Sequence, residues 1–323
     1  MRKRFRLFPH TDNLEGTVMS KHESQNNKTS KIKMINVAPY VFTAPFVIYF
    51  LIFFIYPITS TFWTSLCQQV GFAPPKFAGL ANYKLLMDDY FIMAVENSTI
   101  YTFFTCLILI PLPLFLAVLL DSQFVVKSGI FKSALFIPAL TSVVMAGLFF
   151  KYAFSSNPAA LMNSFIGLFG IEPQNWLEKR GTTWVVLVLF CVWKWLGVNI
   201  VYYLSALQTV PKELYEAATI DGANAWNRFL HITVPGVKPT IIYVLTISIY
   251  GGFSMFAEAF TLFNSARTPG DIGATIVSYI YAQGFNRNNF GIASAAGITL
   301  LAGVMIINMI QLRITDPVGR RSE

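Results

Sequence analysis

Long apolar segments alternate with short polar ones along most of the chain. An uninterrupted apolar run of about 18 residues or more is long enough to cross the hydrocarbon core of a bilayer as a helix. Six such runs occur, at residues 37–62, 92–120, 130–154, 183–204, 240–260 and 292–312. The pattern predicts an all-α, polytopic membrane protein with one six-helix transmembrane domain over residues 37–314.

The composition supports this prediction. Hydrophobic residues make up 54% of the 323 positions and charged residues only 12%, which is too little charge for a water-exposed surface. A net charge of +8 would favour nucleic acid as a partner of a soluble chain, but most Lys and Arg lie in residues 1–36 and in alternate loops. Because positive charge gathers on the cytoplasmic side of membrane proteins, we expect no nucleic acid, and both termini in the cytoplasm.

The two ends of the chain are polar. Residues 1–36 are basic and lack hydrophobic periodicity, and no apolar segment of signal-peptide length precedes Val37. We therefore expect a disordered cytoplasmic tail rather than a cleaved leader, and a second short tail at residues 315–323.

The cysteines and histidines show no spacing typical of a metal site or a disulfide. Cys67, Cys106 and Cys191 are scattered through apolar surroundings. We expect them to pack as small hydrophobic side chains, and we expect this chain to hold no metal or cofactor of its own.

The polar segment 208–239 lies between the fourth and fifth apolar runs. Pro211 suits the start of a helix, and Leu214, Ala217 and Ala218 recur at helical spacing, which predicts a short amphipathic helix. Neither this helix nor the one that follows is long enough to be stable alone in water, so both need a surface to rest on.

A second short helix is predicted after a break in the same segment. Gly222 suits a sharp break, Asp221 suits the N-cap of the second helix, and Trp226 and Phe229 supply an apolar stripe. We expect Pro235 to end this helix.

The residues of this segment resemble a known motif. Glu216-Ala217-Ala218, three residues, Gly222, nine residues and then Ile-x-hydrophobic-Pro ending at Pro235 is similar to the EAA motif of permease subunits in bacterial ABC importers. Further similarity to the carbohydrate group of these permeases, in the member that pairs with a second, distinct permease, covers residues 37–314 and rests on Tyr56-Pro57, Phe77-x-Gly79-Leu80-x-Asn82-Tyr83, Asn97-Ser98-Thr99, Phe136-Ile137-Pro138, Trp176-Leu177 and Ala206-Leu207-Gln208.

The resemblance implies the fold of a type I ABC importer permease in the bacterial cytoplasmic membrane. It implies a heterodimer with a second permease, two nucleotide-binding ATPase subunits that hold ATP and Mg, an extracytoplasmic solute-binding protein and an oligosaccharide substrate. The segment 208–239 would sit in a cleft of an ATPase subunit and transmit its movement. The residues to which the resemblance gives this coupling role are Glu216, Ala217, Ala218, Asp221, Gly222, Ala223 and Pro235.

The residues themselves fit a docking surface. The alanines allow another backbone to come close, and Glu216 offers a carboxylate to a basic partner. The chain has no Gly-x-x-x-x-Gly-Lys-Ser/Thr phosphate loop, so we expect ATP hydrolysis in a separate subunit rather than here. The alternative is an amphipathic hairpin that lies on the inner leaflet.

Two charged residues fall inside predicted spans, where charge is costly. Lys194 lies between Trp193 and Trp195, and Glu258 lies near the end of the fifth run. Lys194 would attract an acidic sugar, such as a uronate derived from alginate or pectin. Alternatively, the two charges form a structural pair, Lys194 extends toward the outer interface, or both couple an ion gradient to transport in a secondary transporter.

Polar and aromatic residues of the later spans could line a sugar path, because aromatic faces stack on sugar rings and amides bond hydroxyls. Helix packing is an equally good explanation for most of them. With the two charges, the candidates are Lys194, Asn199, Tyr202, Tyr203, Tyr250, Ser254 and Glu258.

Overall fold

The computed structural model describes residues 39–122, 128–266 and 268–315. The predicted tail at 1–36, and all but the first residue of the tail at 315–323, lie outside these residues. The chain divides into two units, residues 1–60 and 61–323, which are described separately.

The first unit contains most of the first predicted span. The helix runs from Pro39 to Ser65, with a π-helical turn η1 (Leu51–Ile55) before its last part, α2 (Tyr56–Ser65). Its apolar side chains are exposed, and Phe46, Phe50 and Phe54 stack along one side with ring centroids 6.3 and 5.6 Å apart. This surface is suited to lipid or to another protein.

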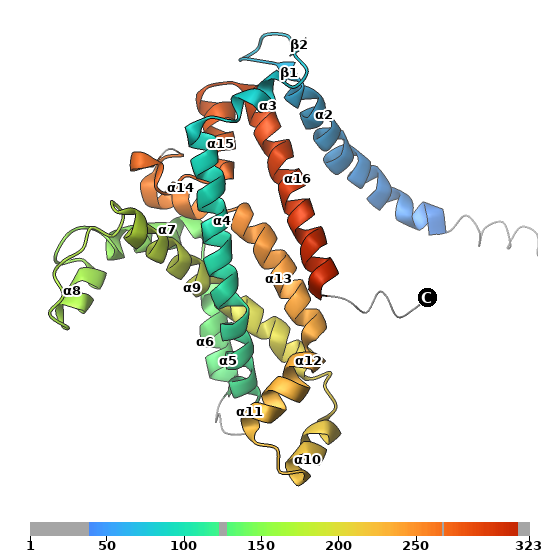
Figure 1. The fold of residues 1–323 in the computed structure, drawn as a ribbon, viewed down its shortest axis with the longest axis vertical. Helices are drawn as coiled ribbons and strands as arrows, with labels where there is room; N and C mark the ends of the chain where they lie inside the picture. The colour runs from blue at the N-terminus through green and yellow to red at the C-terminus, as the bar shows by residue number, and fades with distance from the viewer. Residues whose placement is uncertain (1–38, 123–127, 267, 316–323) are drawn as a thin grey trace, which may run out of the picture. The chain divides into compact units, whose positions relative to one another are not determined.

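The second unit is almost entirely helical (Figure 1). Its elements are β1 (Cys67–Gln68), β2 (Lys76–Phe77), α3 (Ala81–Leu85), α4 (Asp89–Leu109), α5 (Pro111–Asp121), α6 (Ser128–Leu140), α7 (Val143–Ala153), α8 (Leu161–Gly167), α9 (Arg180–Leu207), α10 (Lys212–Ile220), α11 (Ala225–Arg228), the π turn η2 (Phe229–Thr233), α12 (Val234–Gly236), α13 (Lys238–Phe253), α14 (Ala257–Phe263), the 3₁₀ turn η3 (Pro269–Asp271), α15 (Ile276–Tyr281), the π turn η4 (Ala282–Asn286) and α16 (Phe290–Thr315).

The prediction of a multi-span helical protein is confirmed. Five helical segments of the described residues are long and apolar enough to cross a membrane, and a sixth is obtained if α6 and α7 form one span. The short strands β1 and β2 pair antiparallel at one end of the unit, and α10 and α11 lie at the opposite end (Figure 1).

The third predicted span, 130–154, is wrong as a single helix. It is divided into α6 and α7, whose axes differ by 96°. Pro138 lies within α6, and the Thr141 hydroxyl donates back to the Pro138 carbonyl over 2.6 Å. Ser142 then takes an extended conformation with ψ of 134°. A proline removes a helical hydrogen bond, and the chain turns at the end of that weakened turn.

Two other predicted spans contain breaks. The second changes from α4 to α5 at Ile110, directly before Pro111, and the fifth changes from α13 to α14 at residues 254–256. Breaks in lipid persist only where other groups satisfy the freed backbone. Side chains packed against these breaks are therefore expected to supply the missing hydrogen bonds.

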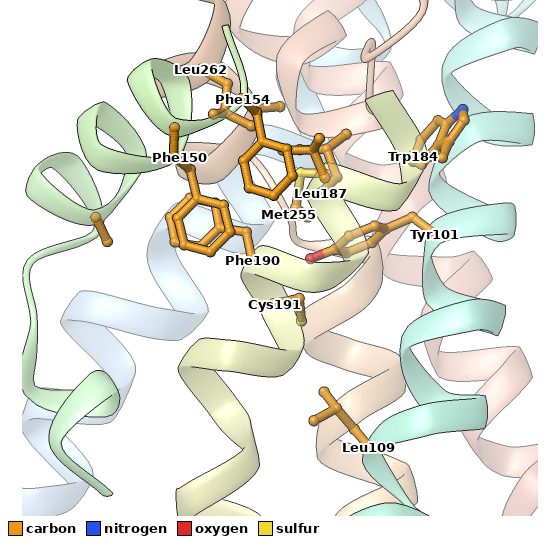
Figure 2. Close-up of a cluster of buried hydrophobic side chains, with 14 residues drawn as sticks. Tyr101, Leu109, Phe150, Phe154, Trp184, Leu187, Phe190, Cys191, Met255 and Leu262 are labelled. Atoms are coloured by element: carbon orange, nitrogen blue, oxygen red, sulfur yellow. The ribbon is translucent and has the colours of Figure 1, made fainter. Parts of the chain in front are cut away.

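Helix α9 is the centre of the second unit, since it packs against α4, α5, α6, α7, α13 and α14. Aromatic rings fix its contact with α7: Phe190 stacks on Phe150 with centroids 4.6 Å apart and planes 17° apart (Figure 2). Farther along, a Cβ atom on Gly197 would lie 2.0 Å from the Leu135 carbonyl oxygen. Only glycine allows α9 and α6 to approach this closely.

Candidate functional site

A cavity of about 360 Å³ opens between α4, α9, α13 and α14, and we call it the central cavity. Its walls combine apolar surface with hydroxyl, amide, indole and carboxylate groups. The polar or aromatic lining side chains are Tyr101, Thr105, Trp195, Asn199, Ser248, Tyr250, Ser254 and Glu258. A largely apolar cavity with a few converging polar groups is typical of a small-molecule site.

The central cavity brings together four of the residues predicted for a sugar path: Asn199, Tyr250, Ser254 and Glu258. Lys194, Tyr202 and Tyr203 are not among its described lining residues, and their place in a sugar path stays a prediction.

Several lining residues were not predicted. Cys191 and Trp195 precede the predicted Asn199 at intervals of four residues on α9, and Tyr101 and Thr105 are likewise four residues apart on α4. A search for polar and aromatic residues at this spacing would have found them, because side chains four residues apart share one face of a helix.

Lys194 is buried within the protein, and only 6% of the residue is exposed. Its Nζ donates to the Thr141 carbonyl oxygen over 2.8 Å. This carbonyl lies in the break between α6 and α7 and is not an acceptor in either helix. The ammonium therefore gives a hydrogen bond to a backbone carbonyl that the break has freed. Both groups are buried, and a buried polar group needs a hydrogen-bond partner.

Two of the alternatives for Lys194 are not met by its contacts. Among the described residues, no ion pair within 4.0 Å joins it to Glu258, and its burial excludes extension to a membrane surface. Its hydrogen bond to Thr141 is that of a structural donor, and a role in the substrate path stays a prediction.

Asn199 performs a similar task one turn farther along α9. Its Nδ2 donates to the Leu109 carbonyl oxygen over 3.1 Å. Pro113, four residues after Leu109, has no N–H to offer this carbonyl. Asn199 thus supplies the donor for the carbonyl freed at the break between α4 and α5, and it also lines the central cavity.

The two adjacent tyrosines serve helix packing. Tyr202 meets Tyr243 of α13 edge to face, with ring centroids 5.4 Å apart and planes at 86°. Tyr203 is fully buried in the cluster formed by α5, α9 and α13. Both help to fix α9 against its neighbours.

Glu258 lies half-buried in the first turn of α14, directly after the break that ends α13. The N-terminal end of a helix favours a negative charge. Glu258 is the one charged residue among the described lining residues of the central cavity, which include no lysine or arginine.

The segment 208–239 forms two short helices, as predicted, with its break at Gly222. The Gly222 φ is +79°, a left-handed conformation that favours glycine. The Ala223 N–H donates to the Ala218 carbonyl over 2.9 Å, and the Gly222 N–H donates to Thr219 over 3.1 Å. Together these bonds form a Schellman motif that ends α10.

The prediction for Asp221 is wrong in detail. Asp221 is the C-cap of α10, whereas the N-cap of α11 is Asn224, whose side-chain oxygen accepts from the Asn227 N–H over 2.8 Å. The Schellman motif uses Gly222 and Ala223 to complete the first helix, which moves the next N-cap two residues beyond Gly222.

The prediction for Pro235 is also wrong. Pro235 lies inside the short α12, near its start, where a proline needs no N–H partner. The helical path bends at Val237 and continues into α13. The Tyr215 hydroxyl lies 3.0 Å from the Thr233 hydroxyl and joins α10 to this path.

The outer surface of this segment is exposed and partly apolar. Glu216, Ala217 and Gly222 are exposed, and Ile220 and Trp226 are 86% and 59% exposed. Large apolar side chains at such exposure on an ordered, polar-flanked loop are typical of a protein interface.

Comparison with known proteins extends these observations. The family described as "Binding-protein-dependent transport system inner membrane component" matches residues 92–318. The arabinooligosaccharides transport system permease protein AraP of Bacillus subtilis is 49% identical over 278 residues, 86% of this chain and 88% of AraP. AraP of Halalkalibacterium halodurans is 41% identical over 279 residues, covering 86% of this chain and 88% of that protein.

A solved structure has the same fold. It is a bacterial ABC transporter involved in the import of the acidic polysaccharide alginate, and one of its chains matches with a TM-score of 0.77 at 23% identity, covering 91% of this chain and 99% of that one. The family match covers most of the chain and includes the cavity-lining helices α9 and α13 and the loop between them. The chain therefore belongs to the family of inner membrane components of binding-protein-dependent transport systems.

Proposed function

We propose that this chain is the permease subunit of an ATP-driven importer for oligosaccharides, and that it forms half of the translocation path. Energy comes from a separate ATPase that binds at the segment 208–239. One observation carries the proposal: α9 and α13, which supply much of the wall of the central cavity, are the two helices that this segment joins. A displacement of the loop therefore acts on both walls of the cavity.

The remaining partners follow from the same role. A second permease completes the path beside Tyr250 and Ser254, which line both the central cavity and an open groove between α13 and α16. An extracytoplasmic binding protein delivers the sugar, as the family description suggests. ATP and Mg belong to the ATPase subunits.

The chemistry of the cavity favours a neutral sugar. Tyr250 and Trp195 offer aromatic faces to a sugar ring, and Ser248 and Ser254 offer hydroxyls. Glu258 would repel a uronate, and the Lys194 ammonium is engaged by Thr141. Arabino-oligosaccharides, named for the AraP relatives, fit this chemistry, and a uronate is the competing substrate.

The test uses the complex purified from cells that express the whole operon and reconstituted in proteoliposomes. We expect ATPase subunits to co-purify, and uptake of a labelled arabino-oligosaccharide to require ATP. Uptake by a lone, ATPase-free oligomer of this chain would overturn the proposal. Faster uptake of an uronate oligosaccharide than of the neutral one would overturn the substrate assignment.

A matched pair of variants tests the cavity. Tyr250→Ala removes a lining aromatic, whereas Tyr202→Ala removes one that packs on Tyr243 outside the cavity. We expect Tyr250→Ala to weaken uptake more strongly at low sugar concentration, while Tyr202→Ala affects stability. Equal uptake by wild type and Tyr250→Ala would contradict the cavity as the sugar path.

The alternative of an ion-coupled transporter finds no support in the site. It requires Lys194 and Glu258 as exchangeable charged groups, but the Lys194 ammonium is held by a backbone carbonyl. We therefore do not propose it.

A further inference from the structure

Helix α8 carries a row of exposed apolar side chains. Leu161, Phe165 and Leu168 recur at i, i+4 and i+7, so they share one face of α8 and its C-cap. Phe169 follows them and meets Phe165 edge to face, with ring centroids 5.5 Å apart. Each of these four side chains is more than half exposed. We call Leu161, Phe165, Leu168 and Phe169 the α8 stripe.

The other face of α8 is fixed to the protein. Met162 packs against the buried cluster of Figure 2. Asn163 is buried, and its Oδ1 accepts from the Trp176 Nε1 over 2.7 Å and from the Gln174 N–H over 3.0 Å. Its Nδ2 donates to the Asn157 carbonyl over 3.1 Å. This packed and hydrogen-bonded face sets the rotation of α8, so the α8 stripe is held away from the protein.

The chain around the α8 stripe carries no charge. Residues 152–171 include no Asp, Glu, Lys or Arg, and the nearest charged residues are Lys151 and Glu172. A protein interface normally has a polar rim around its apolar centre. An uncharged surface of leucine and phenylalanine, with its buried amide turned inward, fits the acyl chains of a lipid, because these chains offer no hydrogen-bond partner.

The α8 stripe also follows the exposed apolar surface of a predicted span. Helix α7 belongs to the third apolar run, packs on α8, and exposes Val144, Phe149 and Tyr152. Tyr152 lies in the last turn of α7, and tyrosine is enriched where the hydrocarbon of a membrane meets the headgroups. Helix α8 therefore begins shortly after the chain reaches this level.

We propose that α8 lies in the plane of the membrane interface, with the α8 stripe among the lipid acyl chains of the leaflet opposite the segment 208–239. Helix α9, which is long and apolar enough to cross the membrane, separates α8 from that segment. The lipid contact holds the loop between α7 and α9 against the membrane. It requires only the membrane location of the chain, so it does not depend on which sugar is carried.

A photoactivatable lipid tests this contact on the wild-type complex. The probe is phosphatidylglycerol with a diazirine on one acyl chain, in vesicles of phosphatidylethanolamine and phosphatidylglycerol. Trypsin cleavage after Lys151 and Lys179 releases residues 152–179 as one peptide, and its fragmentation locates the label. We expect several-fold more label at residues 161–169 than at 172–178. Label in the transmembrane helices without label at 161–169 contradicts the lipid contact.

Spin labels distinguish lipid from water and from a protein partner. Phe165→Cys and Leu168→Cys place a nitroxide on the α8 stripe, and Glu172→Cys is the matched control at an exposed position of the same loop. The native cysteines are buried or half-buried, and wild type gives their background signal. Oxygen concentrates in hydrocarbon, whereas a nickel chelate stays in water. We expect the ratio of oxygen to nickel collisions to be several-fold higher on the α8 stripe than at residue 172.

The spin-label outcomes separate the three environments. Frequent oxygen and rare nickel collisions on the α8 stripe support the lipid contact. Frequent nickel collisions there place the helix in water and overturn the inference. Rare collisions with both reagents mean that another subunit covers the α8 stripe, which also overturns it.

Discussion

Replacing Lys194 by Met removes the donor to the Thr141 carbonyl but keeps a long, unbranched side chain. The change deletes a charge-assisted hydrogen bond of 2.8 Å and leaves a carbonyl of the α6–α7 break without its partner. An unsatisfied buried carbonyl costs about 1–3 kcal/mol. Removal of a buried ammonium offsets part of this cost, because burial of a charge is itself unfavourable. We expect Lys194→Met to lower the free energy of unfolding by about 1–2 kcal/mol.

The assay is thermal unfolding of the purified complex, together with hydrogen exchange of the amides around the break between α6 and α7. A loss of this size lowers the unfolding midpoint by about 1.5–3 °C, since the unfolding entropy of a 323-residue chain is about 0.7 kcal/mol/K. In Lys194→Met the rate of amide hydrogen exchange should rise more at residues 141–146 than at the break between α4 and α5. That break keeps its own donor, Asn199. Uptake of neutral sugar should persist below the unfolding midpoint.

Lys194→Gln is the matched control, because it keeps a donor without the charge. It should lie between wild type and Lys194→Met in stability. Unchanged stability in Lys194→Met, with selective loss of uptake of an acidic sugar, would refute the structural role and return Lys194 to the substrate path.

Three further predictions concern single positions. Asn199→Leu should destabilise the protein by about 1–3 kcal/mol, because the Leu109 carbonyl loses its donor; a midpoint equal to wild type would contradict this. Gly197→Ala should prevent normal packing of α9 on α6, since its Cβ would lie 2.0 Å from the Leu135 carbonyl oxygen, and poor recovery of folded protein is the measurement. At Gly222 a Cβ meets no atom of the described residues within 4 Å, its two chain neighbours aside, so Gly222→Asn, whose side chain tolerates positive φ, should leave the permease stable. If less ATPase subunit co-purifies with Gly222→Asn or with the charged Gly222→Asp, a partner approaches this position closely. Full transport by both variants would contradict the docking role.

Much of the fold could be predicted from local pattern. Apolar run length placed five helical segments correctly, and the glycine in segment 208–239 located the break at Gly222. These features depend on residues close in sequence. The exact capping residues were harder to predict, because Asp221 and Asn224 are both good N-cap residues. The Schellman motif at Gly222 and Ala223 places Asp221 at the end of α10 and leaves Asn224 as the N-cap of α11.

The site could be predicted only in part, because its polar residues serve two purposes. Lys194 and Asn199 were both plausible sugar ligands, and composition alone does not distinguish a ligand from a helix-packing residue. The distinction depends on carbonyls freed at breaks 53 and 90 residues away in the chain. Prolines 113 and 138 signal that carbonyls are freed nearby, but they do not identify the donor.

The sequence by itself determined that this is a helical membrane protein with a structured polar loop and a family motif, because run length, glycine placement and charge position are local properties. Only the tertiary structure decided that α9 supplies the donors for two broken spans, that Asn199, Tyr250, Ser254 and Glu258 share one cavity, and that Lys194 does not line it. The physical reason is that backbone groups freed in an apolar medium must find partners, and those partners are brought near by packing rather than by sequence.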